Sequence, residues 1–291
     1  MAISLGGGGS ASVINETIDI NSAENLITLD DGRVYLKGGV TETDTTTYPD
    51  ATAGFAYTGT TFSTAGQASD ESDLGWDGTY FWLLDRGSNA VYKYSAGGVY
   101  QNVSFSVASQ DTNMWGLVCV GTDFYMVGTS SGKINKYNSA GVFQAGYDIT
   151  PEGYSPFAVT YDGTYLWVIN NGAGQYAYKY STTGVYQNVR FFMGNQDTNP
   201  HGITWDGTSF WVCGRTTDSM YKYNASGVYQ NVSASLASQG TSPQGLVWDG
   251  SALWTVDDTS SAAFKYQNQI GVVSETGTPL TQGKQNYVRI K

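Results

Sequence analysis

The stretch Pro200–Ser235, PHGITWDGTSFWVCGRTTDSMYKYNASGVYQNVSAS, determines the fold expected of this chain. It contains four short runs rich in Val, Ile, Tyr, Phe and Trp, and each run ends in Gly, Asp, Asn or Ser residues that favour turns. This pattern predicts four short β-strands joined by tight turns. Because the same order of runs and turns recurs along the chain, the stretch is one unit of a repeat.

The WDGT turn of this unit has counterparts that read WDGT, CVGT, YDGT and WDGS. The five turns begin at Trp76, Cys119, Tyr161, Trp205 and Trp248. Their successive spacings are 43, 42, 44 and 43 residues. Four strands per unit at this period are typical of a β-propeller blade, because stacked blades bury faces that one blade cannot bury alone. We therefore expect an all-β chain with a five-bladed β-propeller of four-stranded blades.

The last repeat lacks an outer strand of its own, since the pattern stops after AAFKYQNQ at residues 262–269. Upstream of the first turn, Gly59–Ser63 reads GTTFS and occupies the place that GVYQNVS has in other repeats. We predict that this segment adds the outer strand to the last blade and closes the ring.

The chain divides into three predicted parts: an N-terminal arm or small β attachment module at residues 1–54, the propeller at residues 55–270, and a C-terminal extension at residues 271–291. In the first part, NLITL and RVYLKGGV flank Asp30, Asp31 and Gly32. A DG pair between two apolar runs predicts a β-hairpin. The glycine run at residues 6–9 predicts a flexible segment.

The composition excludes several classes of partner. A net charge of −11 argues against nucleic acid, which is bound by clustered Lys and Arg. No apolar run of 18 residues is present, so we expect no membrane insertion, and the start of the chain does not resemble a secretory signal. Five of the 14 basic residues recur once per repeat, which indicates a structural role; they are Lys93, Lys136, Lys179, Lys222 and Lys265.

Two loop positions on one face of the ring differ from repeat to repeat: the loop before the innermost strand and the loop after the second strand. The first position holds Ser72, Trp115, Phe157, His201 and Gln244. The second holds the pairs Asp85 and Arg86, Gly128 and Thr129, Asn170 and Asn171, Gly214 and Arg215, and Asp257 and Asp258. Since the repeat does not dictate these residues, we expect a ligand site among Trp115, Phe157, His201, Gln244, Asp85, Arg86, Asn170, Asn171, Arg215, Asp257 and Asp258.

Structural alternatives exist for several of these residues. Trp115 and Phe157 either contact a ligand or plug the mouth of the channel, since aromatic side chains bury large areas wherever they fit. His201 has no second His or Cys with which to share a metal, so we expect no metal site and no cofactor. Asp257 and Asp258 either bind a ligand or accept hydrogen bonds from nearby turn amides.

The loops QDTN at Asp111–Asn113 and Asp197–Asn199 offer oxygen atoms of the kind that bind calcium, or are ordinary polar turns. Catalysis has little support, because one histidine allows a single triad at most. Asp85 and Asp257 are the one carboxylate pair that suits a glycosidase. We expect a protein that is not an enzyme, with a polysaccharide-degrading enzyme as the alternative.

The units resemble the propeller repeats of the NHL and related bacterial families, which read roughly P-x-G-(I/L)-x-W-D-G-x-x-(L/F)-W-V followed by Y-K-Y-x-x-x-G. The resemblance covers residues 72–270 and implies a fold, not an activity. The first repeat departs from it, because DLGW lacks the Pro and Gly, and the second has CVG for WDG.

The two ends of the chain resemble the ends of tail fibre and tail tip proteins of tailed bacteriophages. The resemblance rests on MAISLGGGGSASVINETIDI, TLDDGRVYLKGGVTETDTTTYPDA and the closing NYVRIK. It implies a virion protein, made in the bacterial cytoplasm, that joins other tail proteins through residues 1–54, with a trimer as the expected oligomer. The propeller would then recognise a receptor on the host surface, and a glycan is the receptor class that we expect. The remaining alternative is a bacterial scaffold or lectin-like propeller.

Overall fold

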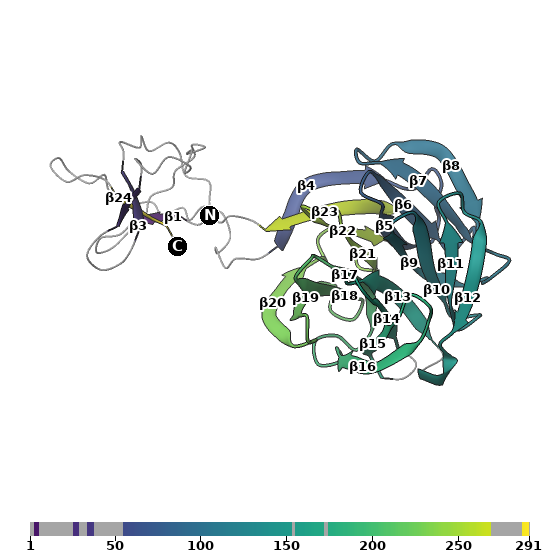
Figure 1. The fold of residues 1–291 in the computed structure, drawn as a ribbon. Coiled ribbons are helices and arrows are strands. Elements are labelled where there is room, and N and C mark those ends of the chain that lie inside the picture. The colour runs from purple at the N-terminus through teal and green to yellow at the C-terminus, as the bar shows by residue number, and fades with distance from the viewer. Residues whose placement is uncertain are drawn as a thin grey trace. The chain divides into compact units, whose positions relative to one another are not determined.

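Residues 55–268, apart from 153–154 and 172–173, are described by a computed structural model, together with the four terminal strands given below. Within this range, five four-stranded antiparallel sheets are arranged in a ring (Figure 1). The predicted all-β, five-bladed propeller is confirmed. Its innermost strands lie next to one another around the ring, because their small and aliphatic residues pack blade against blade.

Each blade runs from an inner strand outward, and its strands follow one another in sequence except in blade five. Blade one contains β5 (Glu71–Trp76), β6 (Tyr80–Asp85), β7 (Ala90–Ser95) and β8 (Tyr100–Ser106). Blade two contains β9 (Met114–Val120), β10 (Asp123–Gly128), β11 (Lys133–Asn138) and β12 (Phe143–Asp148). Blade three contains β13 (Pro156–Tyr161), β14 (Leu166–Asn170), β15 (Tyr176–Tyr180) and β16 (Tyr186–Phe192), and a 3-10 turn, η2 (Thr150–Glu152), precedes it. Blade four contains β17 (Pro200–Trp205), β18 (Ser209–Gly214), β19 (Ser219–Asn224) and β20 (Tyr229–Ser235).

Blade five closes the ring with a strand from the N-terminal side of the propeller. It contains β21 (Pro243–Trp248), β22 (Leu253–Asp257), β23 (Ala262–Asn268) and, as its outer strand, β4 (Phe55–Ser63). Thr58 Oγ1 donates to the carbonyl of Lys265 at 3.1 Å, and Thr61 Oγ1 donates to that of Ala263 at 2.8 Å. The predicted strand exchange is confirmed, and the chain enters and leaves the propeller at the same end of blade five.

The aspartates of the WDG and YDG turns fix the start of the second strand in blades one, three, four and five. In blade four, Asp206 Oδ1 accepts hydrogen bonds from the amides of Thr208 and Ser209, and Asp206 Oδ2 accepts one from Trp211 Nε1 at 2.8 Å. Lys222 lies over the Trp211 ring, with Nζ 5.3 Å from its centroid. Equivalent lysine–aromatic contacts occur in all five blades, so the repeated lysines are structural, as predicted.

Glycine turns between the third and fourth strands lock neighbouring blades together. At Gly227, φ is 76°, and a Cβ atom there would lie 2.2 Å from Cβ of Phe191 in the preceding blade. Positive φ and the absence of a side chain are therefore both required at this position. Gly98, Gly141 and Gly184 make the same contact with Phe62, Phe105 and Tyr147.

The terminal strands form a separate unit, which contains residues 1–54 and 268–291. Its sheet has the order β1 (Ile3–Leu5), β24 (Tyr287–Ile290), β3 (Val34–Lys37) and β2 (Leu26–Thr28). Strands β2 and β3 pair antiparallel, with Leu26 opposite Leu36, as the predicted hairpin requires. The glycine run at residues 6–9 and most of the two terminal segments lie outside the described residues.

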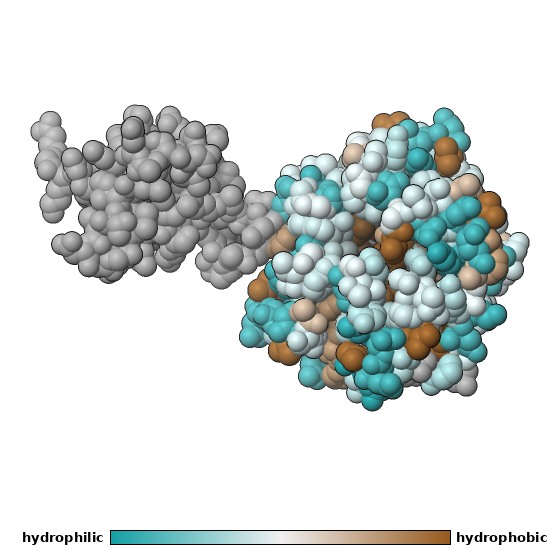
Figure 2. All heavy atoms as spheres, in the orientation of Figure 1, coloured by the Kyte–Doolittle hydropathy of each residue, from teal (hydrophilic) through white to brown (hydrophobic). Residues whose placement is uncertain are grey.

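The surface of the propeller is mixed in polarity. Figure 2 shows hydrophobic residues scattered singly among polar ones on the visible face of the propeller. Isolated apolar residues of this kind are normal on a protein surface. In the part of the chain that the structure describes, no helix has the length and hydropathy needed to cross a membrane.

Candidate functional site

Three aromatic rings from three blades meet where the inner strands begin, at the end of the ring opposite to the WDG turns. Trp115 on β9 lies 4.8 Å from Phe157 on β13 and 5.4 Å from His201 on β17, measured between ring centroids. Phe157 and His201 are 4.8 Å apart. Trp115 and His201 are buried and Phe157 is half-buried. We call this end of the ring, with the loops around the three rings, the channel mouth.

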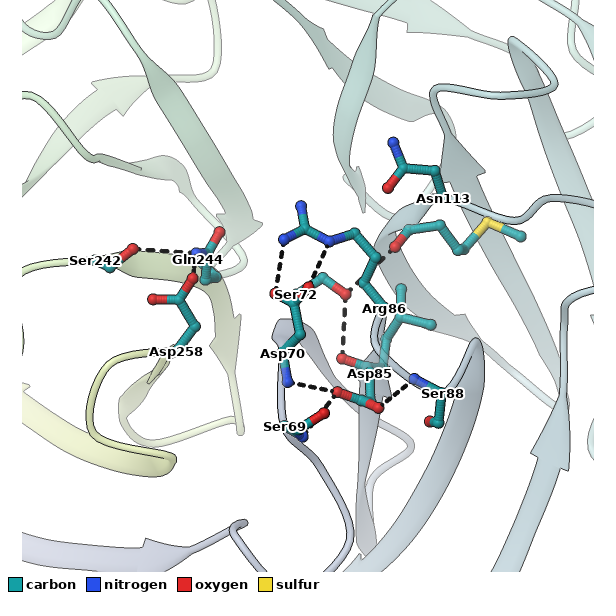
Figure 3. Close-up of polar contacts among 12 residues, drawn as sticks. Ser69, Asp70, Ser72, Asp85, Arg86, Ser88, Asn113, Ser242, Gln244 and Asp258 are labelled. Atoms are coloured by element: carbon teal, nitrogen blue, oxygen red, sulfur yellow. Dashed lines mark hydrogen bonds and ion pairs between the residues drawn. The ribbon is translucent and has the colours of Figure 1, made fainter.

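Arg86 covers one face of the aromatic group. Its Cζ atom lies 3.7 Å from the centroid of the Trp115 ring, in a cation–π contact. Asp70 holds the guanidinium group with two bonds, from Nε at 2.9 Å and from Nη2 at 2.7 Å. The third nitrogen points away from Asp70 (Figure 3). The side chain of Arg86 is 23% exposed.

A second polar group lies opposite, on blade five (Figure 3). Gln244 Nε2 donates to Asp258 Oδ2 at 2.5 Å and to Ser242 Oγ at 3.2 Å. Arg215 from blade four donates to Ser242 Oγ and lies 3.9 Å from Asp258 Oδ2. Both arginines of the mouth are therefore paired with an acidic side chain.

His201 remains neutral at physiological pH. Burial lowers its pKa to about 3, because the imidazolium ion loses its hydration, and the charges of Arg215 and Arg86 act in the same direction. The Gln244 amide opposes this effect. At the mouth, His201 is thus an aromatic ring with neutral nitrogen atoms, and not a cation.

Blade three contributes amide side chains. Asn171 Nδ2 donates to the carbonyl of Pro200 at 2.8 Å and to Asn199 Oδ1 at 3.2 Å, which links blades three and four. The amide of Ser155 donates to Asn170 Oδ1 at 3.4 Å. Ser72, the first-blade counterpart of Trp115, bonds the carbonyl groups of Leu84 and Met114 and so links blades one and two.

Several buried polar atoms of these loops have no hydrogen-bond partner among the described residues. Trp115 Nε1, Asn171 Oδ1 and Gln244 Oε1 belong to the channel mouth. Glu71 Oε2 lies beside it, next to Ser72 in the chain. Folded proteins rarely leave such atoms unpaired. Two further unpaired atoms among the described residues, Asn89 Oδ1 and Asp218 Oδ1, lie in the loops before β7 and β19.

Asp85 and Asp257 hold the loops themselves. Asp85 accepts hydrogen bonds from the backbone amides of Ser69, Asp70 and Ser88. Asp257 likewise accepts from the amides of Ser242, Thr259 and Ser260. Because both carboxylates are buried and bonded to local amides, the glycosidase pair suggested by the sequence has no carboxylate free to act on a sugar.

Blades two and four make the same loop contact, but their aspartate lies in the loop before the inner strand and not after the second strand. Asp197 in the preceding loop accepts from the amides of Asn199, Thr216 and Thr217, and Asp111 does the same for Asn113 and Ser131. The carboxylates of both QDTN loops are thus bonded to local amides. Within the described ranges, no three His, Cys, Asp or Glu side chains are arranged to hold a metal ion.

Glycine occupies the position that faces the carboxylate. A Cβ atom on Gly214 would lie 2.1 Å from Cγ of Asp197, and one on Gly240 would lie 2.1 Å from Cγ of Asp257. Blades four and five therefore each have an aspartate at one of the two facing positions and a glycine at the other. Blade one has Ala68 opposite Asp85 in the same arrangement. The aspartate lies after the second strand in blades one and five and before the inner strand in blades two and four, but the loop contact is the same.

Sequence reasoning missed Asp73, which lies inside the ring at a position that is glycine or alanine in the other repeats. Its carboxylate accepts from the amides of Leu74 and Leu117, both at 2.8 Å, and is also bonded by the amide of Leu246. Burial raises the pKa of Asp73 well above its ordinary value, although these amides offset part of the effect. One carboxylate thus connects the inner strands of blades five, one and two. The departure DLGW from the repeat pattern was the signal for it.

A small cavity opens at the other end of the ring, among the WDG turns. Its volume is about 120 Å³, and the end residues of all five inner strands line it, including Trp76, Cys119, Tyr161, Trp205 and Trp248. This end is the one where the repeats agree most closely. The cavity and the channel mouth are therefore different candidate sites.

Comparison with known proteins supports the fold. No family model matches the chain, and no curated protein matches it. Among solved structures, a glutaminyl cyclase from Myxococcus xanthus is similar over 74% of this chain and 96% of its own, with a TM-score of 0.60 and 10% identity. A catalytically inactive virginiamycin B lyase from Staphylococcus aureus, bound to quinupristin, is similar over 83% of this chain and 93% of its own, with a TM-score of 0.48 and 14% identity.

These structures correct the expectation that the protein is not an enzyme. The chain is similar in fold to a glutaminyl cyclase, so a propeller of this kind does not argue against catalysis. At 10% identity this likeness shows the fold alone. The function of the chain must be argued from its own channel mouth.

Proposed function

We propose that the propeller binds a cell-surface carbohydrate at its channel mouth. The observation that carries this proposal is the meeting of Trp115, Phe157 and His201 inside a ring of arginine, carboxylate and amide groups. Sugars present apolar C–H faces next to hydroxyl groups. A site with a half-buried aromatic surface and polar groups around it is complementary to such a ligand.

The polar groups supply both kinds of hydrogen-bond partner. Arg86 and Arg215 donate, while Asp70, Asp258 and the amide oxygen atoms accept. Because they come from different blades, their positions are fixed by the packing of the ring, which lowers the ordering cost of binding. Phe157 is the ring with exposed surface, and we assign the stacking contact to it.

The test is binding of purified protein to permissive and resistant bacterial cells and to the polysaccharide extracted from the permissive cells. The Phe157→Ala variant is expected to weaken binding at least tenfold. Phe143→Ala is the matched control, because Phe143 is an exposed phenylalanine of outer strand β12. Equal binding by wild type and Phe157→Ala, or no binding to any permissive cell, contradicts the proposal. The amount of reducing ends released in the same samples shows whether the bound polysaccharide is also cleaved.

We further propose that this activity belongs to a bacteriophage tail, with residues 1–54 joining other tail proteins and a trimer as the assembled form. The support is the resemblance of the chain ends to tail fibre and tail tip proteins; the similar solved structures do not bear on it. Mass spectrometry of purified particles tests the location in the virion, and light scattering of the full chain tests the trimer. A protein absent from particles and monomeric in solution contradicts both.

A further inference from the structure

The unpaired atoms of the channel mouth define what a ligand must offer. Trp115 Nε1 is a hydrogen-bond donor, while Asn171 Oδ1 and Gln244 Oε1 are acceptors. Trp115 and Gln244 are 8% and 1% exposed. A buried polar atom without a partner destabilises the protein, because it has lost its bonds to water. A ligand that presents an acceptor toward blade two and donors toward blades three and five would recover much of this cost.

The charge balance of the mouth favours a neutral ligand. Arg86 is paired with Asp70, and Arg215 lies beside Asp258. A carboxylate ligand would have to compete with these aspartates for the guanidinium groups. An ammonium ligand would face the same guanidinium groups and be repelled. Separating either ion pair at a partly buried site is costly, so a charged ligand gains little here.

A planar amide meets these conditions within one group. Its carbonyl oxygen accepts, and its N–H donates on the opposite edge, so that it complements a donor and an acceptor on different blades. A methyl group on the same amide adds an apolar surface of the kind that packs on an aromatic ring. Among sugars, the acetamido group combines these three features, whereas a hydroxyl group has no fixed acceptor edge and no methyl.

We propose that the channel mouth recognises the acetamido group of an N-acetylated amino sugar, an inference that rests on the proposed carbohydrate binding. The carbonyl oxygen accepts from Trp115 Nε1, the N–H donates to Gln244 Oε1, and the methyl group contacts Phe157. Arg86 lies over the Trp115 ring and stays paired with Asp70. The nitrogen of Arg86 that points away from Asp70 is then a second donor to the ligand (Figure 3).

The test is a binding assay on sugar pairs that differ at one carbon: N-acetylglucosamine and glucose, N-acetylgalactosamine and galactose, and N-acetylmannosamine and mannose. At least one acetamido sugar is expected to bind roughly tenfold or more tightly than its hydroxyl partner, the worth of one to two hydrogen bonds. If the hydroxyl sugars bind equally well, this inference is overturned and carbohydrate binding stands. If no sugar binds, both are overturned.

Variants separate recognition from folding. Trp115→Phe removes the indole N–H and keeps an aromatic ring, so it is expected to reduce the preference for the acetamido sugar while residual binding remains. Trp205→Phe makes the same change at the WDG end of blade four and is expected to retain the preference. Melting temperatures of both variants show that they are folded. An unchanged preference in Trp115→Phe overturns the assignment.

Discussion

The double variant Asp197→Gly with Gly214→Asp is expected to be nearly as stable as the wild-type protein, although each single substitution is strongly destabilising. In blade four the carboxylate reaches the loop amides from residue 197. In blade five Asp257, at the position that corresponds to Gly214, reaches the equivalent amides. The double variant therefore gives blade four the arrangement that blade five already has.

The structure sets the size of the effect. Asp197→Gly removes the acceptor for three backbone amides in a partly buried loop, at a cost of about 2–4 kcal/mol, since some of them regain water. Gly214→Asp alone places a second carboxylate where a Cβ atom would already lie 2.1 Å from Asp197 Cγ. Overpacking and repulsion between like charges cost a similar amount, about 2–4 kcal/mol.

Independent effects would therefore add to about 4–8 kcal/mol in the double variant, whereas we expect a loss of about 1 kcal/mol. The assay is thermal or urea unfolding of all four proteins as a double-mutant cycle. For a domain of this size, each single variant should melt roughly 4–16 °C lower, and the double variant within roughly 4 °C of wild type. A double variant that loses the sum of the two single effects refutes the reasoning.

Three other variants or measurements test the remaining features. Because the pKa of Asp73 is raised in the folded state, its contribution to stability is lost as pH increases through that pKa. The free energy of unfolding of wild type relative to Asp73→Asn, measured with urea, should therefore fall as pH rises from about 4 to 8. A rise over this range would contradict the assignment. His201, with a pKa of about 3, should show no imidazole titration between pH 5 and 8 by NMR, and the appearance of a titration curve there would contradict its burial. Gly227→Ala should cost about 2 kcal/mol or more in unfolding experiments, because it meets Phe191 and strains a positive φ, whereas Gly207→Ala, which meets no neighbour but shares the positive φ, should cost less.

The sequence was enough to predict the ring and its closure. A period near 43 residues with four strand-like runs has few structural solutions, because every blade must bury both faces against its neighbours. The missing outer strand of the last repeat then required a donor, and Gly59–Ser63 was the one segment that matched. A structural role for Lys222 was also predictable from the repeat, since a lysine that recurs in every blade is expected to have the same role in each.

The channel mouth was harder to predict, because an alignment of the repeats compares one position at a time. Asp85 and Asp257 look variable when the repeats are aligned, and yet the fold uses each of them to hold a loop. The fold requires one aspartate at either of two facing positions. These positions are 17 residues apart in the chain, and only the structure shows that they are in contact. Asp73 was not predicted for a related reason: it replaces a glycine or alanine of the repeat inside the ring, and its partners on blades two and five are distant in the sequence.

The strand exchange also determines how the propeller carries force. Both connections to the rest of the chain lie at one end of the β4–β23 pair, while the channel mouth lies at the other end of the blade. A pull between a ligand at the mouth and an anchor at the chain ends draws these two strands in the same direction. The two strands are therefore loaded together and are not pulled past each other.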